Sequence, residues 1–260
     1  MLKDWCHPDM LTPLDWRSKM EIAGKGVLIT GASRGLGAAL ARELARRGAR
    51  LALVARGEAA LAEVVASIRA GGGEAHAIPA DVAAKHQTHA IAGAAASLLG
   101  EVEVLVHNAS TLGPLPLPLL ADLACEDLEE VMAANLVGPF RLTKVLVGQM
   151  LLRERGLVVH LSSDAATNAY PRWGAYGASK AALDHLARIW AAELSGTGVR
   201  FLGIDPGEMD TDMHAAAMPE ADRGSLARPE DVAVQVAGMI GDESIPSGAR
   251  IEALAWRSAA

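Results

Sequence analysis

Two kinds of segment alternate along most of this chain. Short, nearly continuous apolar runs, typical of strands covered on both faces, alternate with longer amphipathic segments typical of helices. The runs lie at residues 26–30, 49–55, 74–80, 102–107, 156–162, 199–205 and 251–255. The amphipathic segments lie at residues 35–48, 58–70, 84–99, 126–153, 175–194 and 229–240. Strands that alternate with helices form right-handed βαβ units, so the pattern predicts an α/β fold. We expect one doubly wound parallel sheet of about seven strands with helices on both faces.

The length and charge of the chain suit a single domain that binds neither nucleic acid nor membrane. Its 260 residues can bury the core of one α/β domain. The formal net charge of −7 provides no basic surface for nucleic acid or anionic lipid. No apolar run reaches the roughly 18 residues needed to span a bilayer. Residues 23–260 are expected to form the domain, and residues 1–22 either an ordered arm or an artefact of the start site.

Cysteine and histidine positions give no metal site. Cys6 and Cys125 are far apart, which suits a reducing compartment, although a disulfide between them is the alternative. The first residues lack the apolar core of a signal peptide, so we expect a cytoplasmic location. His86 and His89 lie three residues apart without a third ligand nearby, and we expect both to be exposed polar residues.

The first predicted strand runs directly into a glycine-rich turn that is followed by a helix. Glycines permit the tight turn, the close approach of a pyrophosphate and the packing of the helix on the sheet. The helix N-terminus adds free amides and the positive end of its dipole. The alternative is a turn that binds nothing. We predict a Rossmann-type dinucleotide site formed by Gly31, Ser33, Arg34, Gly35, Leu36 and Gly37.

The end of the second predicted strand indicates which dinucleotide is bound. An NAD enzyme usually has an acidic residue there, which binds the 2′-hydroxyl of the adenosine ribose. This chain has Ala55 followed by Arg56, and Arg34 stands in the glycine-rich turn. Guanidinium groups bind phosphate bidentately, so we predict that both arginines bind the 2′-phosphate of NADP(H). The alternative is that they are solvated surface residues.

A serine, a tyrosine and a lysine are the candidate catalytic residues. Tyr176 and Lys180 are four residues apart on one helix face, and Ser163 follows the fifth predicted strand. A phenol with its ordinary pKa of about 10 is a poor base at neutral pH. A neighbouring ammonium and an oxidised nicotinamide would lower that pKa. We expect Tyr176 to exchange a proton with the substrate oxygen, Lys180 to tune it, and Ser163 to hydrogen-bond that oxygen.

Together these motifs resemble the common cytosolic branch of the short-chain dehydrogenase/reductase family, over about residues 24–256. The resemblance implies an NADP(H)-dependent oxidoreductase in which Lys180 also binds the nicotinamide ribose. It implies that Asn135 is a fourth catalytic residue, which holds a proton-relay water. Further cofactor contacts are implied for Asp81, Val82, Asn108, Ala109, Pro206, Gly207 and Thr211.

One segment departs from the family pattern. After the fourth strand the family usually has Asn-Asn-Ala-Gly, whereas this chain has His107, Asn108, Ala109 and Ser110. Ser110 therefore replaces a glycine that lies close to the cofactor. We expect His107 to be a hydrogen-bonded structural histidine, with a catalytic accessory as the alternative.

The favoured function is that of a carbonyl reductase or alcohol dehydrogenase. A hydrolase built on Ser163 would lack the G-x-S-x-G turn and leave the glycine-rich turn unexplained. The remaining alternative is a non-catalytic NADPH-binding regulatory protein, which would need no proton donor.

Further expectations concern the substrate and the assembly. Tyr170 and Trp173 suit an apolar or ring-bearing substrate, or else simply pack their loop. Residues 208–226 are expected to form a substrate lid. The resemblance implies a homodimer or homotetramer formed through the two helices predicted at residues 126–153 and 175–194. The identity of the carbonyl or alcohol substrate is not encoded in any of these motifs.

Overall fold

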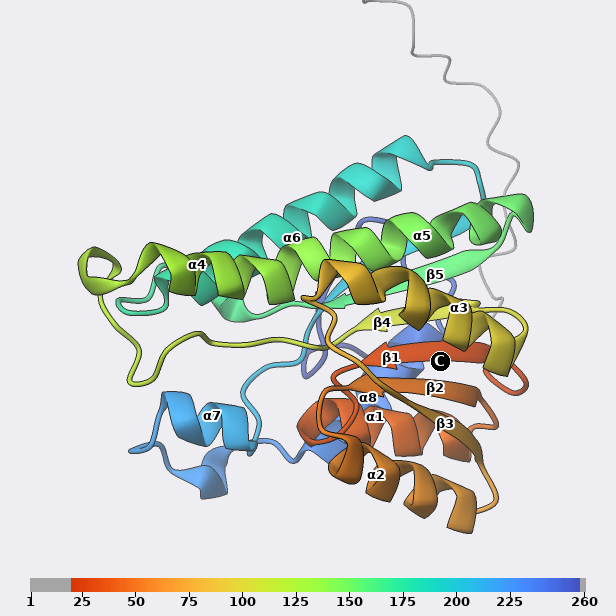
Figure 1. Cartoon of the computed structure of the whole chain (residues 1–260), viewed down its shortest axis with the longest axis horizontal. Helices are drawn as coiled ribbons and strands as arrows, with labels where there is room; N and C mark the ends of the chain where they lie inside the picture. The colour runs from red at the N-terminus through yellow and green to blue at the C-terminus, as the bar shows by residue number, and fades with distance from the viewer. Residues whose placement is uncertain (1–19, 258–260) are drawn as a thin grey trace, which may run out of the picture.

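Seven parallel strands form the central sheet of the computed structural model, which describes residues 20–257 (Figure 1). Their order in the sheet is β3-β2-β1-β4-β5-β6-β7. They are β1 Gly26–Thr30, β2 Arg50–Ala55, β3 Glu74–Pro79, β4 Val104–His107, β5 Gly156–Leu161, β6 Val199–Asp205 and β7 Arg250–Glu252. The four central strands are buried along almost their whole length, which explains their continuous apolar sequences. The predicted fold class is confirmed.

Helices cover both faces of the sheet (Figure 1). One layer contains α1 Gly35–Arg46, α2 Glu58–Ala70 and α8 Pro229–Ile240, and the other contains α3 Thr88–Leu99, α4 Cys125–Met132, α5 Gly138–Leu152 and α6 Gly174–Glu193. Each layer encloses its own apolar core, with Leu40 and Val236 buried in the first and Leu142 and Phe201 in the second. The short helix α7, Asp212–Ala217, projects beyond the carboxyl ends of the strands.

The direction in which successive strands are added to the sheet reverses between β1 and β4. Strands β2 and β3 extend the sheet from one side of β1 to the edge. Strand β4 pairs with the other side of β1, where Val27 lies opposite Val104. In open parallel sheets, ligands bind outside the carboxyl ends of the strands at such a switch point. Both the glycine-rich turn after β1 and the segment after β4 lie there.

The helix predicted at residues 126–153 is interrupted by a wider π-helical turn at Ala133–Val137. Two residues after the turn account for part of the interruption. Pro139 has no backbone N–H to donate, and Gly138 lies so close to the carbonyl of Val82 that a Cβ would be 2.6 Å from that oxygen. The turn contains Asn135, so the interruption falls at a predicted site residue.

The end of the predicted N-terminal arm packs on the domain. The Met20 amide donates to the Gly241 carbonyl at 2.8 Å, and Ile22 is buried against the first core. Residues 1–19 of the predicted arm, including Cys6, lie outside the described residues. Within residues 20–257, no helix is long and apolar enough to cross a membrane.

Candidate active site

The glycine-rich turn has the backbone conformation that its glycines permit. Gly31 and Gly35 have φ values of 68° and 54°, in the left-handed region. A Cβ on Gly31 would be 2.7 Å from the Ala109 Cα, and a Cβ on Gly37 would collide with the Gly31 carbonyl. The residue before α1, Arg34, makes no side-chain capping bond, so the first amides of the helix remain available. The turn thus offers a phosphate a close approach and unpaired donors.

A side-chain bridge joins this turn to the end of β4. Asn108 Nδ2 donates to the carbonyls of Thr30 and Gly31 at 3.1 and 2.9 Å. The Thr30 hydroxyl accepts from the amides of Asn108 and Ala109 and donates to the Val106 carbonyl. Asn108, one of the implied cofactor contacts, therefore lies next to the turn. The role of Thr30 was missed, although its position as the last residue of β1 was a usable signal.

The two arginines assigned to the 2′-phosphate lie near the carboxyl ends of β1 and β2. Both are exposed. Arg34 Nη1 lies 3.7 Å from Asp212 Oδ2 at the start of α7, and both side chains are about three-quarters exposed. The last residue of β2 is Ala55, so the strand end itself carries no carboxylate.

The residues implied for the adenine pocket follow β3. Asp81 Oδ1 accepts from the Ala83 amide at 2.9 Å, which tightens the turn, and Gln87 Oε1 accepts from the Asp81 amide. Val82 packs on the second apolar core. These contacts order the rim of the sheet beside the glycine-rich turn.

The serine, tyrosine and lysine meet at the carboxyl end of β5. Tyr176 and Lys180 lie on the buried face of α6, with 8% and 3% of their surfaces exposed. Lys180 Nζ is 5.5 Å from the centre of the Tyr176 ring and donates to the Leu161 carbonyl at 2.7 Å. Ser163 accepts from the Ala165 amide at 3.2 Å, and its hydroxyl donates to Asp164. The structure therefore brings these three predicted residues together.

Burial governs the protonation of this group. It raises the pKa of Tyr176 to about 12, while a hydrogen bond with Ser163 acts in the opposite direction. It lowers the pKa of Lys180 to about 8, and the carboxylates of Asp184 and Asp205 oppose that shift. The lowered tyrosine pKa expected from the sequence applies to Tyr176 beside an oxidised nicotinamide. In the protein alone, desolvation of the phenolate dominates, and Tyr176 is a protonated donor at neutral pH.

Asn135 is buried beneath the site and its side chain is fully engaged. Its Nδ2 donates to the Thr111 carbonyl and to the Ser179 hydroxyl, both at 2.9 Å. Its Oδ1 accepts from the Thr111 amide at 2.8 Å and from the Ser110 hydroxyl at 3.1 Å. Ser110, which replaces the expected glycine, thus holds Asn135. The side chain locks the π-helical turn to α6 and to the segment after β4.

The segment after β6 forms the opposite wall. Gly207 has a φ of 74°, and its amide donates to Asp205 at 3.0 Å. The Thr211 hydroxyl caps α7 by accepting from the His214 amide at 3.2 Å, so its own proton is free to donate. The Thr211 hydroxyl also borders the cavity, where it can donate a hydrogen bond.

An ion-pair network that the sequence argument missed supports this wall. Arg250, in β7, contacts Asp184 of α6 at 3.0 Å and Asp205 of β6 at 2.7 Å. It also donates to the Ser163 carbonyl at 2.9 Å, and Ser162 donates to Asp184 at 2.6 Å. The only signal in the sequence was a carboxylate at the end of an apolar strand, where it needs a partner.

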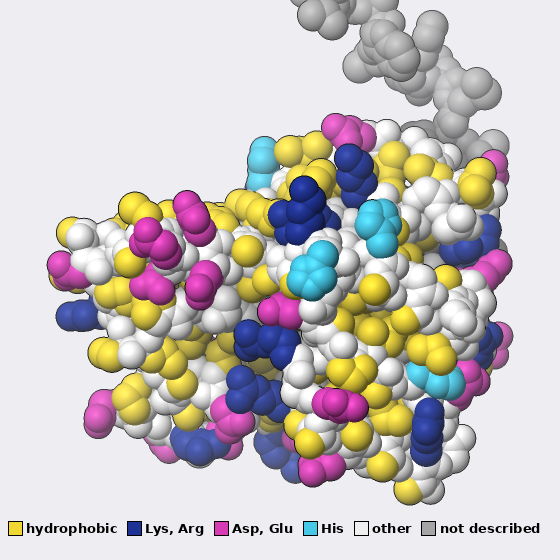
Figure 2. All heavy atoms as spheres, in the orientation of Figure 1, with side chains coloured by type: hydrophobic (Ala, Val, Ile, Leu, Met, Phe, Trp, Pro, Cys, Tyr) yellow, Lys and Arg dark blue, Asp and Glu magenta, His cyan; other side chains and the backbone are white. Residues whose placement is uncertain are grey.

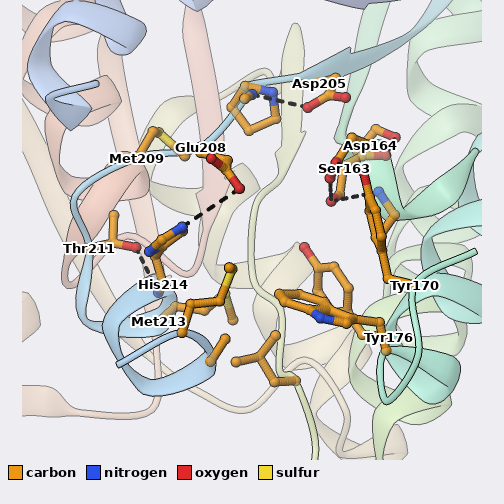
Figure 3. A pocket seen from close by; sticks show the side chains of 18 of the residues that line it. Ser163, Asp164, Tyr170, Tyr176, Asp205, Glu208, Met209, Thr211, Met213 and His214 are labelled. Atoms are coloured by element: carbon orange, nitrogen blue, oxygen red, sulfur yellow. Dashed lines mark hydrogen bonds and ion pairs between the residues drawn. The ribbon is translucent and has the colours of Figure 1, made fainter. Parts of the chain in front are cut away.

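A cavity of about 460 Å³ lies above these residues (Figure 3). Ser163 and Tyr176 reach it from one side, and α7 with the segment before it closes the other. Trp173 packs edge-on against Tyr176, with ring centres 5.7 Å apart. The remaining walls of the cavity are mainly apolar and are formed by Leu112, Ala165, Pro171, Met209, Met213, Ala217 and Met218. Its volume suits a small organic molecule.

His107 has a structural environment. Its Nε2 lies 2.8 Å from the Thr143 hydroxyl, and its ring stacks on that of His160 in the neighbouring strand at 5.0 Å. Burial lowers the pKa of both imidazoles, that of His160 to about 3. Two neutral rings in the sheet interior fit the interpretation of His107 as a structural histidine.

The switch-point turn and the buried tyrosine–lysine pair beside the cavity are features of an α/β protein with a ligand site at the carboxyl ends of its strands. The family model for short chain dehydrogenases matches residues 25–222. The chain belongs to the short-chain dehydrogenase/reductase family, which confirms the resemblance.

Known proteins similar to this chain carry different cofactors and substrates. It is 35% identical over 186 residues to the ketoacyl reductase HetN of a Nostoc species, which covers 72% of this chain and 64% of that protein. A short-chain dehydrogenase of Shigella flexneri, complexed with NADP, is 27% identical with a TM-score of 0.84, covering 91% of this chain and all of that one. A 7α-hydroxysteroid dehydrogenase, complexed with NADH and a 7-oxo bile acid, is 29% identical with a TM-score of 0.81, covering 89% and 94%.

Proposed function

We propose that this protein is an NADP(H)-dependent carbonyl reductase or alcohol dehydrogenase. The observation that carries the proposal is the position of Tyr176. Its hydroxyl borders the cavity, beside Ser163, while Lys180 lies beneath its ring and the glycine-rich turn lies across the switch point. A protonated phenol at that position can supply a proton to a carbonyl oxygen in the cavity.

The residues divide the reaction among them. NADPH, when bound, supplies the hydride that the carbonyl carbon accepts. Tyr176 gives its proton to the carbonyl oxygen, and the Ser163 hydroxyl donates a hydrogen bond to the same oxygen. The Lys180 ammonium then stabilises the phenolate that remains, until solvent returns a proton. Asn135 positions this group through Ser179 and Thr111.

The proposed cofactor is NADP(H), held by the glycine-rich turn. Gly31, Ser33, Gly35, Leu36 and Gly37 would surround the pyrophosphate, where a Cβ on Gly31 or Gly37 would collide with the backbone. Arg34 and Arg56 would bind the 2′-phosphate, and the carboxylate paired with Arg34 in the described chain is the exposed one of Asp212, at 3.7 Å. Asp81, Val82, Asn108 and Ala109 would line the adenosine side, and Pro206, Gly207 and Thr211 the nicotinamide side.

The alternative is an NADPH-binding regulatory protein without turnover, and it does not account for the arrangement of Tyr176, Lys180 and the cavity. Such a protein needs neither a buried lysine beneath a tyrosine nor a cavity at the phenol. The two possibilities are separated by incubating the protein with NADPH or NADH and a panel of neutral aldehydes, ketones and quinones. Consumption of the cofactor at 340 nm, dependent on a carbonyl compound, is expected. Tight NADPH binding without turnover of any compound would contradict the proposal.

We further propose that the protein is a homo-oligomer of the cytoplasm. Its Cys125 is free and exposed, which suits a reducing compartment. Exposed apolar side chains on the outer helix layer, such as Phe140 and Ile189, provide a surface for a second copy.

A further inference from the structure

The ionisable side chains that line the cavity are mainly carboxylates, together with the imidazole of His214. Among the described residues that line it there are three carboxylates and no lysine or arginine. One of them, Asp205, is neutralised by Arg250 at 2.7 Å. The other two, Asp164 and Glu208, have no lysine or arginine within ion-pair distance in residues 20–257. A charged ligand in this cavity would therefore face two carboxylates that are not paired with lysine or arginine, while the Lys180 ammonium lies behind the Tyr176 ring.

The two carboxylates come from different elements and lie on opposite sides of the cavity (Figure 3). Asp164 follows β5, and its oxygens accept from the hydroxyls of Ser163 at 3.1 Å and Tyr170 at 2.8 Å. Glu208 follows β6, and one of its oxygens lies 3.9 Å from His214 Nε2. Neither hydroxyl carries a positive charge, so the two hydrogen bonds hold the Asp164 carboxylate in place without neutralising it.

The surfaces between the carboxylates are aromatic and thioether-rich. Tyr170 and Trp173 present rings to the cavity, and three methionines, Met209, Met213 and Met218, line it from the lid side. Ring faces attract ammonium groups, and thioethers adapt to apolar bodies of different shape. A wall of this kind accommodates an apolar group that carries a positive charge better than an equally large anion.

We propose that this cavity selects carbonyl substrates that combine an apolar body with a positively charged nitrogen. The proposal rests on the proposed carbonyl-reductase function and specifies its substrate class. A cation would gain attraction from Asp164 and Glu208, and that attraction increases when α7 covers the cavity and excludes water. A carboxylate or phosphate substrate would be repelled by both. The phosphates of the cofactor are proposed to bind at the glycine-rich turn, Arg34 and Arg56, none of which lines the cavity.

A matched set of three ketones tests the charge directly. Each is an acetophenone with a para methylene group that carries trimethylammonium, tert-butyl or carboxylate. The first two have the same shape and differ in charge, and the methylene weakens the inductive effect of the substituent on the carbonyl, which the ratio between variants then cancels. We expect kcat/KM with NADPH to be about tenfold higher for the cation than for its neutral isostere, and lowest for the carboxylate. Added salt should reduce the preference because it screens partly exposed charges.

Variants locate the source of the preference. Glu208→Gln and Asp164→Asn each remove one charge at nearly constant shape, and each should reduce the cation-to-neutral ratio about threefold. Taking a ratio within each variant cancels any general loss of activity. Glu193→Gln is the matched control, because Glu193 is exposed 17 residues beyond Tyr176 on α6, at a distance of about 25 Å along the helix. It should leave the ratio unchanged.

The outcomes separate this inference from the proposed function. If neutral carbonyl compounds turn over but the three ketones show no charge preference, the substrate class is wrong and the function stands. The substrate class is also wrong if the charge preference persists in both variants. It is wrong, too, if both variants lose activity equally on all three ketones, because that result would indicate a purely structural role for the two residues. If no carbonyl compound turns over with either cofactor, the proposed function fails and this inference fails with it.

Discussion

At the residue scale, one hydroxyl group carries the proposed chemistry. Tyr176→Phe keeps the buried ring and its edge-on contact with Trp173, but it removes the proton donor. We expect kcat to fall by at least about a thousandfold, at the upper part of the range for general acid–base catalysis. NADPH affinity, measured by fluorescence titration, should stay within a factor of about two, because the change removes one hydroxyl from the site. A variant that kept a few per cent of the wild-type kcat would show that another group donates the proton.

Cofactor choice also depends on single residues. We expect NADPH to be favoured over NADH by about a hundredfold in kcat/KM, since a charge-assisted contact contributes about 1.5–3 kcal/mol. The double change Ala55→Asp with Arg56→Ala should erode or reverse the preference, because a carboxylate repels the 2′-phosphate and accepts from the 2′-hydroxyl. Steady-state kinetics with both cofactors measures the ratio. Equal use of both cofactors by the wild type would mean that the arginines face solvent, and it would leave the role of Tyr176 untouched.

The buried histidine pair predicts how stability depends on pH. Burial, with repulsion from Lys180, lowers the pKa of His160 to about 3 in the folded chain. Its unfolded value is about 6.5, so between these values the unfolded state binds more protons. The contribution is complete above pH of about 6.5 and is lost as the pH falls toward 3. From pH 7 to pH 5 the wild type should lose about 2 kcal/mol through His160.

Urea unfolding of His160→Gln at both pH values tests this assignment. The variant should lose about 2 kcal/mol less than the wild type on acidification, whatever its stability at pH 7. His89→Gln is the control, because that ring is exposed on α3 and meets water in both states. An identical acid dependence of His160→Gln and the wild type would assign the loss to other groups.

At the scale of elements, α7 and its flanking segments are the part most suited to move. Residues 208–226 connect β6 to the loop before α8, and in this segment α7 has no buried residue. Its links to the rest of the chain include the exposed Arg34–Asp212 pair and the contact of Met209 with Ala227. We expect limited proteolysis within residues 208–226 to slow several-fold when NADP⁺ and a substrate analogue are both bound. Equal cleavage with and without ligands would argue against a lid.

Elements with strong periodicity could be predicted from the sequence, and those decided by distant contacts could not. The strands and long helices were placed within a few residues, because buried parallel strands have continuous apolar sequences. The π-helical turn around Asn135 was missed, since it depends on Gly138 meeting the Val82 carbonyl and on partners from β4 and α6. The Arg250 network was missed for the same reason: its members are far apart in sequence. The raised pKa of Tyr176 in the protein alone depends on burial, which no motif reports.

At the scale of the whole molecule, the outer faces of α5 and α6 are the proposed assembly surface. Phe140 and Ile189 are 37% and 40% exposed, and Phe140 lies beside Trp190 with ring centres 6.2 Å apart. Apolar patches also appear on the face seen in Figure 2. We expect sedimentation at micromolar concentration to give a dimer or tetramer of the 27.0 kDa chain.

Charge on that surface should break the assembly. The double change Phe140→Glu with Ile189→Glu places like charges on facing copies and should shift the protein toward the monomer. Leu98→Glu, at a similarly exposed position on α3, should leave the assembly unchanged. A wild-type protein that sediments only as a monomer would contradict the proposal, and so would a variant that stays oligomeric.

The Arg250 network also has a consequence for the order in which a newly made chain becomes an enzyme. The glycine-rich turn and its Asn108 bridge use residues from the first half of the chain, so a ribosome-bound nascent chain contains them early. Arg250 emerges far later, and only then can it join β7 to Asp184, Asp205 and the Ser163 carbonyl. Because α8 packs on α1 and Arg250 supports the opposite wall, both sides of the site are completed only after the second half of this sequence has been made.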